Sequence, residues 1–152
     1  MTAEIGVRWD RSGLTDDDHA SPRLNLVWAA SPSTAVRAGW GYYYQSQRPH
    51  ELQVADGETD FRSAEKAEHR TLGFEHWWQT GRGHWSLRAE AYQRITEDVR
   101  PRYENLFDPF PLYPETSYDR YLIAPESSEA VGAELFLTRR GGGAFDWWAN
   151  YT

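Results

Sequence analysis

Strict alternation of apolar and other residues is the feature that most constrains this chain. Near the N-terminus, Ile5, Val7 and Trp9 alternate with charged residues and glycine. A period of two is typical of a β-strand that presents one apolar face. Similar runs lie at about 23–29, 36–43, 69–78, 85–94, 131–138 and 145–151. The pattern therefore predicts an all-β protein, an antiparallel up-and-down meander of about seven strands.

The connections between these runs alternate between long and short. The long stretches are residues 12–21, 45–66 and 96–127, and the short turns are residues 31–34, 80–83 and 139–143. In an up-and-down sheet, this alternation predicts that every long loop lies at one end and every short turn at the other.

The two faces of the predicted sheet differ in charge. His76 is the only ionisable side chain expected on the apolar face apart from Tyr42 and Tyr151. The other face collects the charged side chains Arg8, Asp10, Arg23, Arg37, Glu75, Arg88, Glu90, Arg94, Glu134 and Asp146. Placing Trp78 opposite Trp85 across the glycine turn puts Glu75 opposite Arg88, where an ion pair would contribute about 0.2–1 kcal/mol. The same register puts Gly73 opposite Glu90.

Alternation alone does not separate a soluble sheet from a membrane wall, because a soluble antiparallel sheet also has one apolar face. Strands of about nine to eleven residues suit a tilted bilayer span. Short turns at one end and longer loops at the other are typical of transmembrane barrels. Aromatic rings also flank the apolar band, as membrane interfaces favour; they are Trp28, Trp78, Trp85 and Phe145 at the turn end, and Trp9, Trp40 and Tyr42 at the loop end. These features predict part of a transmembrane β-barrel.

Composition excludes several other classes of protein. The chain has 152 residues, no Cys and a net charge of −7, which argues against disulfides, Cys-ligated metals and nucleic-acid binding. No apolar run approaches the roughly 18 residues of a membrane helix. The acidic stretches 16–18 and 56–60 lack the full ligand spacing of a calcium loop. No nucleophile elbow or phosphate loop is present, so we expect no enzyme activity, no cofactor and no metal site.

An ordered series of motifs resembles the β-barrel of TonB-dependent outer-membrane receptors. The matching segments are SPRLNLVW at 21–28, TAVRAGWG at 34–41, YQSQRPHEL at 44–52, LGFE at 72–75, AVGAEL at 130–135 and ANYT at 149–152. Each motif alone is weak evidence for the family. The motifs follow one another in the family's order along nearly the whole chain, and this ordered series is considerably more specific.

The resemblance implies energised import of a scarce ligand across the outer membrane of a Gram-negative bacterium. The ligand class would be an iron–siderophore or other metal chelate, cobalamin or a saccharide. Expected partners are outer-membrane lipid, a plug domain and TonB. No plug is visible in residues 1–152, so we expect a fragment of the barrel that supplies about a third of a wall of about 22 strands.

Candidate ligand-binding residues lie on the long loops and on the charged face. Arginine and aromatic side chains can clamp carboxylates and stack on rings. The candidates are Tyr43, Tyr44, Arg48, Arg88, Arg94, Arg100, Arg102, Tyr103 and Arg120. The third loop also contains Phe107, Phe110, Tyr113, Tyr118 and Tyr121. The alternative for each ring is packing within a compact, proline-braced loop.

Two other functions remain open from the sequence. One is a passive porin-like outer-membrane barrel, which an upstream plug domain would exclude. The other is a soluble, aromatic-rich β-protein that binds carbohydrate, which would refold in water without detergent.

Overall fold

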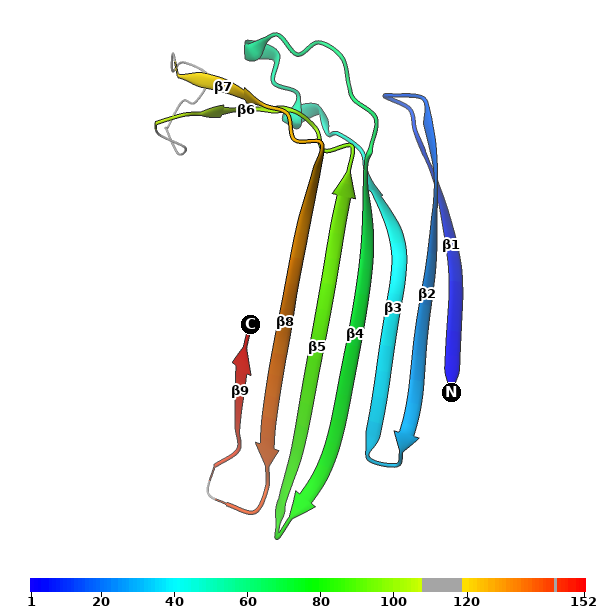
Figure 1. The fold of residues 1–152 in the computed structure, drawn as a ribbon, viewed down its shortest axis with the longest axis vertical. Coiled ribbons are helices and arrows are strands. Elements are labelled where there is room, and N and C mark those ends of the chain that lie inside the picture. Colours follow the sequence, from blue (N-terminus) through cyan, green and yellow to red (C-terminus); the bar gives the residue numbers. More distant parts are fainter. Residues whose placement is uncertain (108–118, 144) are drawn as a thin grey trace.

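Seven strands form one antiparallel sheet in the order β1-β2-β3-β4-β5-β8-β9 (Figure 1). The structure, a computed structural model, describes residues 1–107, 119–143 and 145–152. The sheet strands are β1 (Thr2–Ser12), β2 (Asp17–Ser31), β3 (Thr34–Gln45), β4 (Glu65–Thr80), β5 (Gly83–Glu97), β8 (Ser127–Arg140) and β9 (Trp147–Tyr151). β6 (Arg102–Asn105) and β7 (Arg120–Ile123) form a separate two-stranded sheet. The all-β, antiparallel meander predicted from the alternation is confirmed.

The connections gather at two opposite ends of the sheet, which we call the loop end and the turn end (Figure 1). The described connections are residues 13–16, 46–64, 98–107 and 119–126 at the loop end, and residues 32–33, 81–82, 141–143 and 145–146 at the turn end. The short 3₁₀ helices η1 (Pro49–Glu51) and η2 (Val54–Asp56) and the β6–β7 pair all lie at the loop end. No helix in the described residues is long and apolar enough to cross a membrane.

The first connection is much shorter than the predicted loop at 12–21. β1 and β2 pair continuously from Thr2 opposite Val27 to Ser12 opposite Asp17, which leaves only residues 13–16 between them. The polar stretch 12–21 predicts a loop because it lacks apolar alternation. A strand that continues beyond the apolar band does not need apolar residues, and β2 begins within this stretch. The same reason explains why β4 and β5 reach 16 and 15 residues, more than a tilted bilayer span requires.

The apolar side chains share one face along the register. Val36 pairs with Phe74, Phe74 with Ala89, and Ala89 with Leu135. Large side chains on this face stay exposed, with Leu72 at 59% and Leu135 at 46%. None of the large side chains in the described residues is fully buried. A soluble domain of this length buries most of its apolar surface, so this face requires a cover that the sheet itself does not supply.

The apolar face becomes charged toward the loop end, which corrects the prediction that His76 is its only ionisable side chain besides tyrosine. Arg70 donates to Glu68 at 2.9 Å and to Gln93 at 3.2 Å. Trp40 donates its indole N–H to Glu68 at 2.7 Å. Gln93 in turn donates to Glu129 on β8 at 2.6 Å. This outer charged row ends an apolar band that covers about 20 Å of β4, at about 3.3 Å per residue.

Aromatic rings mark the other boundary of the apolar band, at the turn end. Trp78 lies opposite Trp85, as predicted, and the two rings stack at 5.8 Å. Trp147 of β9 meets Trp85 edge-on at 5.5 Å, and the Arg139 guanidinium lies 5.8 Å from the Trp85 ring. Amphipathic rings in this arrangement suit a membrane–water interface.

The polar face has the predicted register but a different ion pair. Glu75 lies opposite Arg88, and Gly73 lies opposite Glu90. Glu75 nevertheless pairs with Arg37 of β3 at 3.0 Å, while the Arg88 guanidinium lies 5.7 Å from the Phe136 ring. Gly73 separates Arg37 from Glu90 in the register, and without a side chain there Arg37 can reach diagonally across β4 to Glu75.

Glycine on the polar face makes room for a tyrosine ring. Tyr92 on β5 lies opposite Gly132 on β8, and a Cβ at Gly132 would lie 2.4 Å from the tip of the Tyr92 ring. At Gly73, by contrast, a Cβ would meet nothing closer than 3.6 Å. The two glycines therefore differ sharply in how they tolerate a side chain.

We expect Gly132→Ala to destabilise the sheet by about 1–3 kcal/mol, because the methyl group overpacks the site and displaces the Tyr92 ring. Urea unfolding in detergent micelles, followed by tryptophan fluorescence, measures the change. Gly73→Ala is the matched control and should stay within about 0.5 kcal/mol of the parent. Equal losses in both variants would contradict the role of the ring contact.

Candidate functional site: the loop cluster

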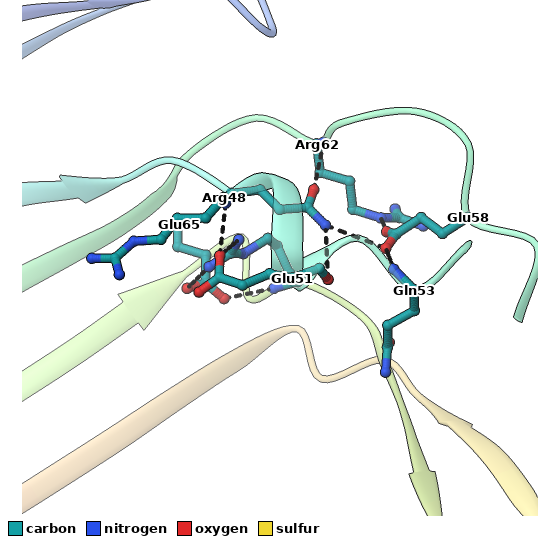
Figure 2. A network of polar contacts seen from close by, with 8 residues as sticks. Arg48, Glu51, Gln53, Glu58, Arg62 and Glu65 are labelled. Atoms are coloured by element: carbon teal, nitrogen blue, oxygen red, sulfur yellow. Dashed lines mark hydrogen bonds and ion pairs between the residues drawn. The ribbon is translucent and has the colours of Figure 1, made fainter. Parts of the chain in front are cut away.

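Two long connections at the loop end are braced together by the side chain of Arg100. Its guanidinium pairs with Glu51 at 3.1 Å and with Glu65 at 3.3 Å, and its backbone N–H donates to Glu65 at 2.8 Å (Figure 2). Only 14% of the Arg100 side chain is exposed. We call residues 46–65, 98–107 and 119–123 the loop cluster.

The Gln53 side chain links the 46–64 connection to strand β6. The Gln53 side-chain amide donates to the Tyr103 carbonyl at 3.1 Å and accepts from the Tyr103 N–H at 2.8 Å. One side chain thus satisfies both backbone groups of a β6 residue, as a neighbouring strand would. Arg120 of β7 adds an ion pair with Asp56 and donates to Asn105 at 3.2 Å.

The 46–64 connection is folded around the carboxylate of Glu58. This group accepts hydrogen bonds from the Gln53 N–H at 3.0 Å, from the Gln47 amide at 3.2 Å and from Arg62 at 3.2 Å (Figure 2). Pro49 occupies the first position of η1, where no backbone N–H is needed. Gly57 ends η2 with a φ of 91°, which favours glycine.

A cavity of about 540 Å³ lies between the two connections. Its volume falls in the range of small-molecule sites. The lining combines carboxylates, arginines and one histidine with a few apolar groups: Gln47, His50, Glu51, Leu52, Gln53, Val54, Ala55, Asp56, Glu65, Arg100, Pro101, Arg102 and Arg120. The described residues contain no group of three or more His, Cys, Asp or Glu side chains that could hold a metal ion.

Four of the predicted site residues meet in the loop cluster. Arg100, Arg102 and Arg120 line the cavity, and the Tyr103 ring lies 6.0 Å from the Arg120 guanidinium. Arg102 pairs with Glu104 and keeps 53% of its side chain exposed. The half-buried Arg100 and Arg120 already pair with carboxylates of this chain, so they position the loops.

The other candidates lie apart from this cavity. Arg88 and Arg94 lie on the polar face of β5, and Tyr43 and Tyr44 line a separate cleft beside β1 and β2. Arg48 lies at the start of η1, and its backbone N–H donates a hydrogen bond to the Glu51 carboxylate at 2.8 Å. Phe110, Tyr113 and Tyr118 lie outside the described residues.

The sequence did not predict which acidic residues pair with these arginines. Glu51, Glu65 and Asp56 lie 35 to 64 positions from the arginines that they bind. No local spacing connects residues so far apart, and an acidic loop residue is normally solvated. Gln53 was missed for the same reason, since its partner Tyr103 is 50 positions away.

Hydrogen bonding lowers the pKa of two carboxyls in the loop cluster. For Glu51 the largest cause is the hydrogen bond from the Arg48 N–H; burial opposes the shift, and Arg100 reinforces it. For Glu58, burial acts to raise the pKa, but the bonds from Gln53, Arg62 and Gln47 together outweigh it, so the pKa is lowered. Both groups therefore favour the folded loop in their ionised form.

A model of the family described as "TonB dependent receptor-like, beta-barrel" matches residues 1–152. The chain therefore belongs to this family of outer-membrane receptors, whose members are transporters rather than enzymes. No curated protein and no solved structure matches the chain. The resemblance inferred from the motifs is confirmed at the level of the family.

We expect Arg100→Gln to loosen the loop cluster, because it removes both ion pairs between the connections and leaves Glu51 and Glu65 without their shared cation. Limited proteolysis should cut residues 46–64 at least about tenfold faster, in line with the loss of charged hydrogen bonds. Arg48→Gln is the control, since its guanidinium makes no ion pair with the described residues. Equal protection of both variants would show that the brace is dispensable.

Acid should loosen the same cluster. A lowered folded-state pKa means that stabilisation is full above the ordinary glutamate pKa of about 4.3 and is lost as pH falls through the lowered values. Hydrogen exchange at the Arg48 and Gln53 amides, which bond Glu51 and Glu58, should show protection at pH 7 that falls below about pH 4. Exchange is corrected for its intrinsic pH dependence, and unchanged protection at pH 3 would contradict the assignment.

Proposed function

We propose that this chain forms part of the wall of a TonB-dependent receptor that imports a small ligand through a plugged barrel. The observation that carries the proposal is the braced loop cluster and its cavity, held at one end of a two-faced sheet. The apolar face contacts lipid, the charged face lines the lumen, and the loop end faces the outside of the cell. Family membership supports this over a soluble carbohydrate-binding protein.

The ligand is a small molecule bound at the loop end, in the class of an iron–siderophore, cobalamin or a saccharide. The braces hold the cavity in shape before any ligand arrives, which lowers the ordering cost of binding. Arg102, with its exposed guanidinium, and Tyr121, which is 62% exposed, are accessible candidate contacts in the loop cluster.

The plug domain and TonB complete the transport cycle in this proposal. Arg88 and Arg94 on the polar face of β5 would face the plug and the translocation path. TonB would use the proton gradient of the inner membrane to rearrange the plug and open that path. The wall itself would stay rigid, because its strands are joined by continuous backbone pairing.

Single-cysteine labelling tests the orientation, and the chain offers a clean background because it has no Cys. Asp60→Cys lies on the 46–64 connection, Arg82→Cys on a short turn, and Leu135→Cys on the apolar face. In intact cells, a membrane-impermeant maleimide should label only Asp60→Cys. Permeabilising the outer membrane should add Arg82→Cys, while Leu135→Cys should react slowly throughout.

The cysteine-free parent controls for background labelling. Labelling of Arg82→Cys but not Asp60→Cys in intact cells would reverse the orientation. Rapid labelling of Leu135→Cys in both samples would show that the apolar face is in water, which would overturn the membrane wall.

A further inference from the structure

A second cavity opens where β2 and β3 separate near the loop end. The two strands pair from Ser31 opposite Thr34 up to Arg23 opposite Gly41, and no pairing continues beyond. The next residue toward the loop end of β2 is Pro22, which has no N–H to offer a neighbouring strand. β2 stays paired with β1 beyond this point, whereas β3 continues with β4. The result is a cleft of about 310 Å³.

The cleft has a polar lining with an excess of positive charge. Its residues are Arg8, Asp10, Arg11, Ser12, His19, Ser21, Arg23, Tyr43, Tyr44 and Ser46, three arginines against one carboxylate. Two of the arginines are already paired, Arg8 with Asp10 and Arg11 with Asp16, each at 2.6 Å. None of these residues lines the cavity of the loop cluster, so the two sites are separate.

Arg23 is the arginine without a partner. Its guanidinium lies 4.5 Å from the centre of the Tyr43 ring, and it makes no hydrogen bond or ion pair with the described residues. Its Nε is buried and makes no hydrogen bond. Nε2 of His19, which lines the same cleft, faces the Asp17 carboxylate at 3.8 Å. Buried donors of this kind normally have a partner, and leaving one without costs about 1–3 kcal/mol.

Two neighbours hold the basic groups in position. A Cβ at Gly41 would lie 3.0 Å from Cγ of Arg23 and 3.1 Å from the Pro22 carbonyl oxygen, so glycine there lets the arginine stem lie across β3. His19 stacks on Tyr44 with ring centres 4.4 Å apart and planes 13° from parallel. The Tyr43 ring is 37% exposed and offers part of its surface to a ligand.

We propose that this cleft is an anion-binding subsite that takes a carboxylate or phosphate group of the transported ligand. Arg23 supplies the guanidinium for a charge-assisted pair, and Tyr43 contacts an aromatic or apolar portion of the same molecule. The volume accommodates one small acid or one arm of a larger ligand. The subsite deepens the proposed import function, since it lies on the polar face below the extracellular connections.

The test uses three fluorinated probes that share a ring and differ in charge. They are 4-fluorobenzoate, 4-fluorophenyl phosphate and the neutral 4-fluorobenzamide, each followed by ¹⁹F NMR with the full chain in detergent micelles. Protein-free micelles correct for partitioning of the probes. We expect at least one of the two anions to bind and the amide to bind at least about tenfold more weakly, because the charged hydrogen bond is lost.

Variants assign the binding to the cleft. Arg23→Gln should weaken anion binding about tenfold or more. Gly41→Ala should also weaken it, because the added methyl group displaces the Arg23 side chain. Arg140→Gln removes an arginine from the turn end of the same face without touching the cleft and should leave the affinity unchanged.

The anion that binds identifies the chemistry of the ligand as carboxylate or phosphate. Equal affinity for the amide and the anions would overturn the proposal, and so would Arg23→Gln binding as the parent does, since the cleft would then hold only water. These outcomes are independent of the cysteine labelling, which tests the membrane orientation without reference to any ligand.

Discussion

Hydrogen bonding between the backbones of neighbouring strands is the interaction on which the rest of this structure depends. In a bilayer no water is available to satisfy a free N–H or carbonyl, so a spanning sheet must pair residue by residue across the whole apolar band. β4 and β5 meet this requirement without interruption from Lys66 opposite Glu97 to Thr80 opposite Gly83. The ladder fixes which side chains share a face, and the division into an apolar and a charged surface follows from it.

The two candidate binding sites lie where the pairing between neighbouring strands ends. The strands continue beyond the apolar band, and there the connections fold back on one another and are joined by ion pairs such as Arg100 with Glu51 and Glu65. Pro22 ends the β2–β3 pairing at the same level, and the cleft around Arg23 results. Both candidate binding sites thus lie where the continuous pairing of neighbouring sheet strands ends.

The strand content and the register of the β4–β5 hairpin could be predicted because both follow from short-range rules. Alternation identified each strand core, and a tight turn fixed Trp78 opposite Trp85 and therefore every pair above it. The strand ends were harder to predict. Residues such as His19 and Glu68 lie in strands but beyond the apolar band, so the sequence there shows no apolar alternation. The braces of the loop cluster were not predictable, since Asp56 and Arg120 meet across 64 positions of chain.

The Tyr92–Gly132 contact has a consequence for how the wall assembles. Alternation determines the face of each side chain, yet it does not exclude a slip of two residues, which leaves every apolar side chain on the same face of the sheet. Such a slip between β5 and β8 would move the Tyr92 ring from Gly132 to Ala130 or Glu134, where a side chain already occupies the space. The packing of the Tyr92 ring over Gly132 therefore selects one strand register among several that the hydrophobic pattern alone allows.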